Sequence, residues 1–424
     1  MLGAFLGHHR ERACENPAVT YHQSALAALI TEAVNRVCLQ MDVLTSAFRR
    51  AVPPLADNHL RRQCGTGPLY EALLFRPRGP RRTLEARAAE EVVLMSTALY
   101  RLESQLLVNG REPVDVVSHF GAMQGQDLPG VITSIALRTP TKSRERVIDA
   151  FNSGELVRTW PQRGTLHVVN ADRVRDLLVV ARARTFPQTV RRREQLGIDD
   201  VVLEQARSIA RDVVGAGITR KGLIQAWDKA GLVAQQGVAY HLIFHLSLEG
   251  LLVWGPMVGN EQLIVLLDEW VPEAPEADYG DIVGDIVFRY VRSHAPTTRK
   301  DIGWWANLPL REIDQALAGS EYVEKDGWWV KDELQKAGAR SLYLLPGFDE
   351  MLLGYADRSA SLSPDRAADV CPGNNGVFKP TIMLGGAVIG TWQRSTLTAS
   401  FFEEPSDSLR KRVDRALKKV PYKI

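Results

Sequence analysis

The sequence contains little cysteine and no long uninterrupted apolar run. Its cysteines form no CxxC pair and have no histidine at metal-ligand spacing, so neither a disulfide framework nor a zinc site is predicted; they are Cys14, Cys38, Cys64 and Cys371. The apolar runs near VVLMSTALY and LLDEWV are short and interrupted by charge, far below the roughly 20 residues of a membrane span. The first residues also lack the plan of a signal peptide. We therefore expect a soluble, cytoplasmic protein without a membrane partner.

The usual catalytic signatures are missing as well. There is no GxSxG elbow, no P-loop, no GxGxxG turn after a strand and no HExxH helix. His241 and His245 are four residues apart on a predicted helix, but no third ligand lies near them in the sequence, and we expect both to be structural. The sequence thus predicts no metal site and no cofactor.

The chain also lacks a general excess of basic residues. Its net charge is +2 over 424 residues. If the chain binds DNA, its basic side chains must therefore cluster in space. The length suggests about two to four domains.

Residues 1–94 differ in composition from the rest. They hold amphipathic helical stretches such as SALAALITEAVNRVCLQMDVL, and then the segment LLFRPRGPRR, which breaks any regular element. All nine tryptophans come after residue 159. Two interpretations stay open: a helical extension with a linker, or an upstream stretch that the working protein does not use, with Met95 as its functional start.

Two glutamines stand between predicted helices in residues 95–215, which we interpret as a first winged-helix region. Gln124 and Gln126 lie in GAMQGQDLPG, after the helical pattern PVDVVSHFGAM, and Asp127 is placed to cap the helix PGVITSIALR. The stretch LVRTWPQRGTLHVV then carries Arg163 and His167 on predicted strands among apolar neighbours. Burying such side chains is costly unless they find partners.

One pattern occurs twice further along the chain. Residues 216–275 and 276–337 each predict a threonine-capped helix, a second helix and a two-stranded hairpin, which is the plan of a winged helix. TRKGL and TRKDI occupy the same place in both, and we expect their basic residues to contact DNA: Arg220, Lys221, Arg299 and Lys300. An earlier copy is plausible where SRERVIDAF leads into two strands. Winged helices also dock proteins, so this alternative stays open.

The C-terminal residues 338–424 differ from the preceding units in their predicted secondary structure. They are rich in predicted strands, and Gly385 and Gly386 predict a tight hairpin between KPTIML and AVIGTW. A basic amphipathic helix, PSDSLRKRVDRALKKV, closes the chain, with its charges on a solvated face or on phosphates. The whole sequence therefore predicts a mostly helical α+β fold, with tandem winged-helix units before a β-rich region.

Four segments together, from about residue 95 to the C-terminus, resemble the AlkZ/YcaQ family of tandem winged-helix DNA glycosylases. They are PVDVVSHFGAMQGQDLPG, LVRTWPQRGTLHVV, LLPGFDEMLLGYADRS and FKPTIMLGGAVIGTW. The family's catalytic motif is Q-aliphatic-Q in one branch, associated with self-protection against DNA-alkylating natural products. It corresponds to Gln124, Gly125 and Gln126, with Gly125 replacing the usual small aliphatic residue.

The resemblance implies a monomeric, monofunctional glycosylase acting on double-stranded DNA with alkylated or crosslinked purines. Gln124 and Gln126 would orient a water, since an N7- or N3-alkylated purine is already a good leaving group and an amide holds water without changing charge. Asp127 would cap its helix or help to stabilise the cation. Arg163 and His167 would lie near the channel, and the hairpin at Gly385 and Gly386 would probe the lesion from a groove.

Two other functions stay open from the residues alone. One is a winged-helix transcriptional regulator that binds an operator and releases no base. The other is a protein that binds adducts without cutting.

Overall fold

The computed structural model describes residues 96–275, 277–330 and 335–420. The predictions for residues 1–94 therefore lie outside the described residues. The described part combines helices with antiparallel sheets, which confirms the predicted α+β class. None of its helices is both long and apolar enough to cross a membrane.

The larger sheet has five antiparallel strands in the order β1-β3-β2-β4-β5. They are β1 (Met123–Gln124), β2 (Leu156–Gln162), β3 (Thr165–Asn170), β4 (Leu252–Val258) and β5 (Glu261–Leu266). The strands predicted in LVRTWPQRGTLHVV are β2 and β3. Arg158 on β2 pairs with Trp254 on β4, so the predicted first and second units share one sheet.

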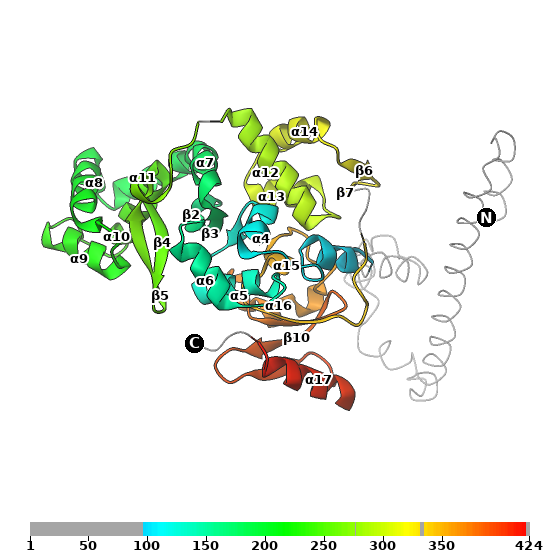
Figure 1. Cartoon of the computed structure of the whole chain (residues 1–424). Helices are drawn as coiled ribbons and strands as arrows, with labels where there is room; N and C mark the ends of the chain where they lie inside the picture. Colours follow the sequence, from blue (N-terminus) through cyan, green and yellow to red (C-terminus); the bar gives the residue numbers. More distant parts are fainter. Residues whose placement is uncertain (1–95, 276, 331–334, 421–424) are drawn as a thin grey trace, which may run out of the picture. The chain divides into compact units, whose positions relative to one another are not determined.

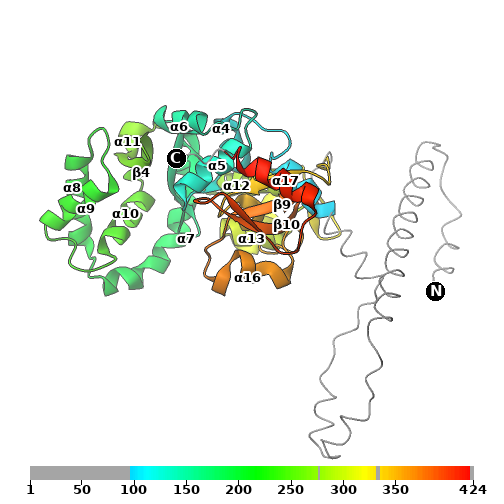
Figure 2. The same ribbon diagram turned by 90° about the horizontal axis from the view of Figure 1, so that it is seen from below.

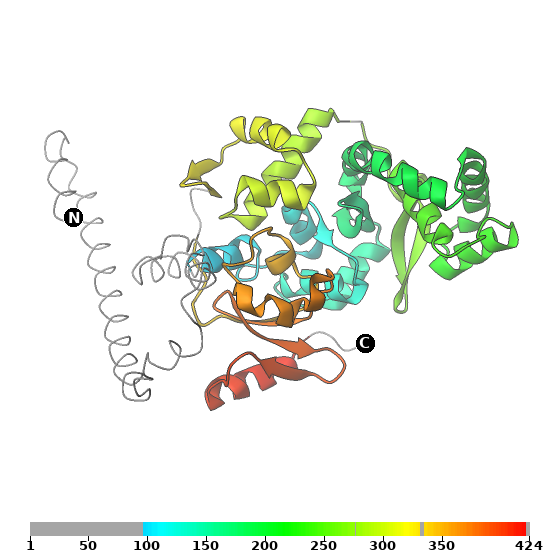
Figure 3. The same cartoon turned by 180° about the vertical axis from the view of Figure 1, so that it is seen from behind.

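Both repeats have the predicted order of helices followed by a hairpin (Figure 1; seen from behind in Figure 3). Side chains of Thr219 and Thr298 accept hydrogen bonds at the starts of α9 and α13, as expected of N-caps. The first repeat comprises α9 (Arg220–Lys229), α10 (Val238–Glu249) and the hairpin β4–β5, and α8 (Asp200–Val214) precedes it. The second comprises α12 (Tyr279–His294), α13 (Arg299–Ala306), α14 (Leu310–Ala318), β6 (Val323–Lys325) and β7 (Trp328–Val330).

The assignment of these repeats as winged helices, and the domain boundaries, stay predictions. One hydrophobic core runs from Ala122 to Tyr322 and includes residues of all three predicted units. Packing therefore continues across the predicted boundaries rather than stopping at them.

A second core lies under the predicted glutamine motif. It is formed by β1, β3 and three helices, and includes Phe120, Met123, Ile132 and Phe151, all nearly inaccessible to solvent. The helices are α4 (Pro113–Phe120), α5 (Leu128–Leu137) and α6 (Arg144–Asn152). Further helices are α7 (Val174–Gln195), α11 (Leu267–Trp270), α15 (Glu350–Leu353), α16 (Ala367–Val370) and α17 (Asp407–Leu417).

The C-terminal sheet has four antiparallel strands in the order β11-β10-β9-β8. The basic helix α17 lies along it (Figure 2), with Val413 and Leu417 packed against Trp392. The helix thus has an apolar, sheet-facing side and a charged outer side. The strands are β8 (Leu342–Leu345), β9 (Thr381–Leu384), β10 (Ala387–Gln393) and β11 (Thr398–Phe401).

The tight hairpin at Gly385 and Gly386 is present, and its expected contact with DNA stays a prediction. Both glycines are buried, and both have positive φ, 58° and 84°. A Cβ on Gly385 would lie 2.4 Å from the carbonyl oxygen of Ala339, and one on Gly386 would lie 2.7 Å from Cβ of Ala98. Positive φ and the close approach of Ala98 and Ala339 both favour glycine here, and the protein's own chain covers the two glycines.

Candidate active site

Gln124 and Gln126 occupy different environments at the edge of the larger sheet. Gln124 ends β1 opposite His167 of β3, and only 8% of it is exposed, whereas Gln126 is exposed in the bend before α5. The amide oxygen of Gln124 is buried and has no hydrogen-bond partner among the described residues. A buried acceptor without a protein partner can accept a hydrogen bond from a water or a ligand.

Asp127 stands at the N-cap position of α5, but its side chain makes no capping hydrogen bond. The expectation that this carboxylate caps the helix is therefore wrong. Its Oδ1 instead lies 3.8 Å from a guanidinium nitrogen of Arg394, which follows β10. The residue thus links the glutamine motif to the β10–β11 turn of the C-terminal sheet.

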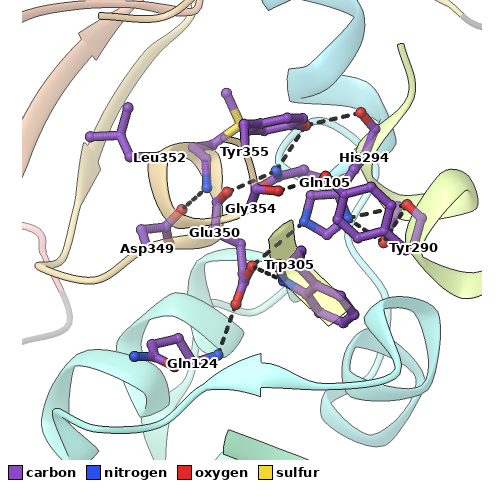
Figure 4. A network of polar contacts seen from close by, with 12 residues as sticks. Gln105, Gln124, Tyr290, His294, Trp305, Asp349, Glu350, Leu352, Gly354 and Tyr355 are labelled. Atoms are coloured by element: carbon purple, nitrogen blue, oxygen red, sulfur yellow. Dashed lines mark hydrogen bonds and ion pairs between the residues drawn. The ribbon is translucent and has the colours of Figure 1, made fainter. Parts of the chain in front are cut away.

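Glu350 is a buried carboxylate in contact with the backbone of Gln124 (Figure 4). Its Oε1 accepts a hydrogen bond from the Gln124 N–H at 2.8 Å, and its Oε2 accepts one from Nε1 of Trp305 at 3.1 Å. Nε2 of His294 lies 3.5 Å from the same Oε2. Burial opposes ionisation, but the interactions with His294 and the Gln124 N–H lower the pKa of Glu350 to about 2. The group is therefore a carboxylate at neutral pH.

The neighbouring Asp349 fixes Glu350 in place. Arg138, the residue that follows α5, makes two hydrogen bonds of 2.9 Å to the Asp349 carboxylate, and Ser134 donates a third at 2.6 Å. Neither Arg138 nor Asp349 is significantly exposed. A buried ion pair of this geometry fixes the relative position of two chain segments, since separating its partners leaves an unpaired buried charge. Glu350 is thereby held against the strand that carries Gln124.

His167 is completely buried beside Gln124. Its Nδ1 lies 2.9 Å from the carbonyl oxygen of Thr165, which can only accept, so Nδ1 carries the proton. Its Nε2 faces the amide nitrogen of Gln162 at 3.4 Å. Burial lowers the pKa of His167 to about 4, so the ring is neutral at pH 7.

Two arginines from the same hairpin border this site. Arg158 on β2 donates to the carbonyl oxygen of Gly125 at 3.0 Å, and burial lowers its pKa to about 10, which leaves it charged. Arg163 forms the β2–β3 turn with Gly164, and its guanidinium lies 4.5 Å from the ring centre of Trp304. His167 thus lies opposite Gln124, whereas Arg163 lies in a turn rather than on the predicted strand and contacts Trp304. The roles of both residues stay predictions.

Gly125→Ala is expected to lower the free energy of unfolding by about 1–2 kcal/mol, because the space beside it is filled. An added Cβ would lie 3.1 Å from Cδ of Arg158 and 3.3 Å from the backbone of His167. Urea unfolding should measure the loss. Gly284→Ala in α12 is the control, since its Cβ would meet no atom within 4 Å and alanine favours a helix. Unchanged stability of Gly125→Ala would show that Arg158 moves aside freely.

The four basic residues predicted to bind DNA lie at the starts of two helices. Arg220 and Lys221 are exposed in the first turn of α9, and Lys300 is exposed in that of α13. Arg299 is also exposed, but its guanidinium lies 2.7 Å from Asp314. DNA binding by these residues stays a prediction.

Sequence reasoning assigned no role to Glu350, His294 or Trp305. The available signal was the pair of acids in PGFDEMLLGY, where Asp349 and Glu350 interrupt an otherwise apolar stretch. Charges in such a place need partners if they are buried. No group of three potential ligands within the described ranges could hold a metal ion.

Comparisons with known proteins agree with this architecture. The sequence pattern of the AlkZ-like DNA glycosylases matches residues 117–420. An interstrand DNA cross-link repair glycosylase of Streptomyces sahachiroi is 24% identical over 325 residues, covering 69% of this chain and 86% of that protein. The solved structure of the Streptomyces sahachiroi DNA glycosylase AlkZ superposes with a TM-score of 0.65 at 20% identity, covering 77% of this chain and 96% of that one, which establishes a shared fold. Because the family pattern spans most of the sequence, this chain belongs to the AlkZ-like DNA glycosylase family.

Proposed function

We propose that this protein is a monofunctional DNA glycosylase of the Q-x-Q type, in which Gln124 and Gln126 place the attacking water. Its substrates are N7-alkylguanine and N3-alkyladenine in duplex DNA. Unhooking of interstrand crosslinks is part of the proposal, supported by the name of the Streptomyces sahachiroi relative. Family membership supports the reaction class.

The observation that carries the proposal is the buried amide oxygen of Gln124, which has no partner among the described residues. A water donating to this oxygen would be held in a fixed position. Gln126 is exposed two residues along and can bind the same water or the sugar beside it. Fixed placement of a nucleophile can contribute several kcal/mol to lowering a barrier.

The chemistry requires little acid or base assistance. The water oxygen forms a bond to C1′ while the bond from C1′ to the purine nitrogen breaks. The electron pair of the broken bond neutralises the cationic alkylpurine, and the water's proton leaves to solvent. Neutral amides and the neutral ring of His167 suit this reaction, because none of them must change charge.

Glu350 supplies a buried negative charge beside the glutamine motif. Its carboxylate binds the backbone N–H of Gln124. In a site of low polarity, a fixed carboxylate stabilises the positive charge that develops on the sugar. Glu350 therefore acts as a positioning residue that also favours the cationic transition state.

The test is release of free base by the full chain from duplexes with N7-methylguanine, N3-methyladenine or a nitrogen-mustard crosslink. We expect release of the methylated bases, with a rate nearly constant from pH 5.5 to 8. The pKa of His167 is lowered to about 4 and that of Glu350 to about 2, so neither group changes charge in that range. Binding of damaged duplex without release at any pH would favour a lesion-binding protein. Sequence-specific binding of undamaged DNA without release would favour a regulator.

A further inference from the structure

Trp304 on α13 is a large aromatic side chain at the protein surface. It is 36% exposed, whereas the next residue, Trp305, is 2% exposed and donates its ring N–H to Glu350. Lys300, four residues earlier, lies on the same exposed side of the helix. The indole of Trp304 is thus accessible to solvent, and the next residue in the chain, Trp305, binds the Glu350 carboxylate.

Two guanidiniums lie against the Trp304 ring. The central carbon of Arg163 is 4.5 Å from the ring centre, and that of Arg358 is 5.2 Å from it. Within residues 96–275, 277–330 and 335–420, neither arginine forms an ion pair with a carboxylate. Nε of Arg163 is also buried without a hydrogen-bond partner in those ranges. The two positive charges therefore have capacity to bind an anion.

Arg163 occupies a backbone position that disfavours arginine. Its φ is +51° at the first residue of the two-residue β2–β3 turn, where glycine, asparagine or aspartate is less costly. Such a conformation is unfavourable for a bulky residue and is often kept where the side chain has a function. Here the conformation brings the guanidinium to Trp304.

We propose that Trp304 contacts a base of the damaged strand while Arg163 and Arg358 bind the phosphates of that strand. This inference rests on the proposed glycosylase function. An exposed aromatic ring with flanking guanidiniums matches the chemistry of a nucleotide, whose planar base packs on indole and whose phosphate accepts hydrogen bonds from arginine. Because Trp305 holds Glu350, a strand bound at Trp304 lies beside the carboxylate that contacts Gln124.

The first test measures affinity for two matched duplexes, one undamaged and one with a single N7-methylguanine, by fluorescence anisotropy. Trp304→Ala should weaken binding of the damaged duplex about 5- to 100-fold, the range found for loss of one base–aromatic contact. Trp304→Phe should recover part of the affinity because it keeps an aromatic face. Leu310→Ala is the control, since Leu310 is a 43% exposed apolar side chain on the neighbouring α14.

The second test measures the salt dependence of binding. Arg163→Gln should reduce the slope of log affinity against log salt by about one, as expected for loss of one phosphate contact. A purely structural role of Arg163 would leave this slope unchanged.

The inference is overturned if Trp304→Ala binds the damaged duplex as the unmodified chain does, or if Arg163→Gln keeps the full slope. An equal loss of affinity in Trp304→Ala and Leu310→Ala would overturn it too, because it would point to a disturbed fold. Absence of base release from the unmodified chain would instead reject the glycosylase function. The affinity comparison would still decide whether Trp304 contacts the damaged strand.

Discussion

Gln124→Ala together with Gln126→Ala is expected to lower base release from N7-methylguanine duplex by at least about a hundredfold, as loss of a preorganised polar group does in other enzymes. The amide oxygen of Gln124 is the buried acceptor to which the water would donate, and alanine leaves that water without a fixed position. DNA affinity should change little, because the phosphate contacts proposed above come from other side chains. Single-turnover release and anisotropy measure the two effects separately.

The single variants sharpen this expectation. Gln124→Ala should account for most of the loss, since Gln124 is buried beside His167 while Gln126 is exposed. Gln188→Ala is a matched control, because Gln188 is exposed on α7 and its amide nitrogen donates to the carbonyl oxygen of Arg184 one turn earlier. Unchanged base release by the double variant would show that Gln124 and Gln126 are not catalytic residues.

Glu350→Gln is expected to lower the free energy of unfolding by about 1–3 kcal/mol and to slow base release. Both carboxylate oxygens accept hydrogen bonds, one from the Gln124 N–H and one from the Trp305 ring N–H. A glutamine has one oxygen, so one of these buried donors would face an NH₂ group instead. The variant also removes the negative charge that favours a cationic sugar.

Urea unfolding at several pH values separates these contributions. Contacts in the folded state lower the pKa of Glu350 to about 2 from its ordinary value of 4.5, so its stabilising effect is complete above about pH 4.5 and is lost as the pH falls toward 2. The stability difference between the unmodified chain and Glu350→Gln should therefore shrink in acid. Glu324→Gln, which neutralises an exposed acid on β6, serves as the control. Equal stability and equal release in Glu350→Gln would show that the buried carboxylate has no role.

Local features of the fold could be predicted because the signals lie in a few adjacent residues. The turns at Asp326–Gly327 and Gly385–Gly386 have positive φ at both positions, as their sequences indicate, and Thr219 and Thr298 cap the helices that follow them. These features depend on backbone conformation within one turn. Tertiary structure adds little to them.

The candidate site could be predicted only in part, because its contacts join distant segments. Gln124 and Glu350 are 226 positions apart, and neither local sequence indicates that the two residues are in contact. The burial of the Gly385–Gly386 turn could not be predicted from its sequence either, since it depends on contacts with Ala98 and Ala339. The glutamine motif is recognisable in the sequence through the family resemblance. The position of the Glu350 carboxylate beside it depends on contacts that form only in the folded chain.

The pairing of β2 with β4 limits how such a protein can evolve. Because Arg158 and Trp254 join strands of two predicted units, removal of either unit would leave an open sheet edge, which invites association with other chains. Units linked in this way cannot be exchanged or lost as independent modules. The repeats would have to diverge together within one chain, and a change in one would be constrained by its neighbour.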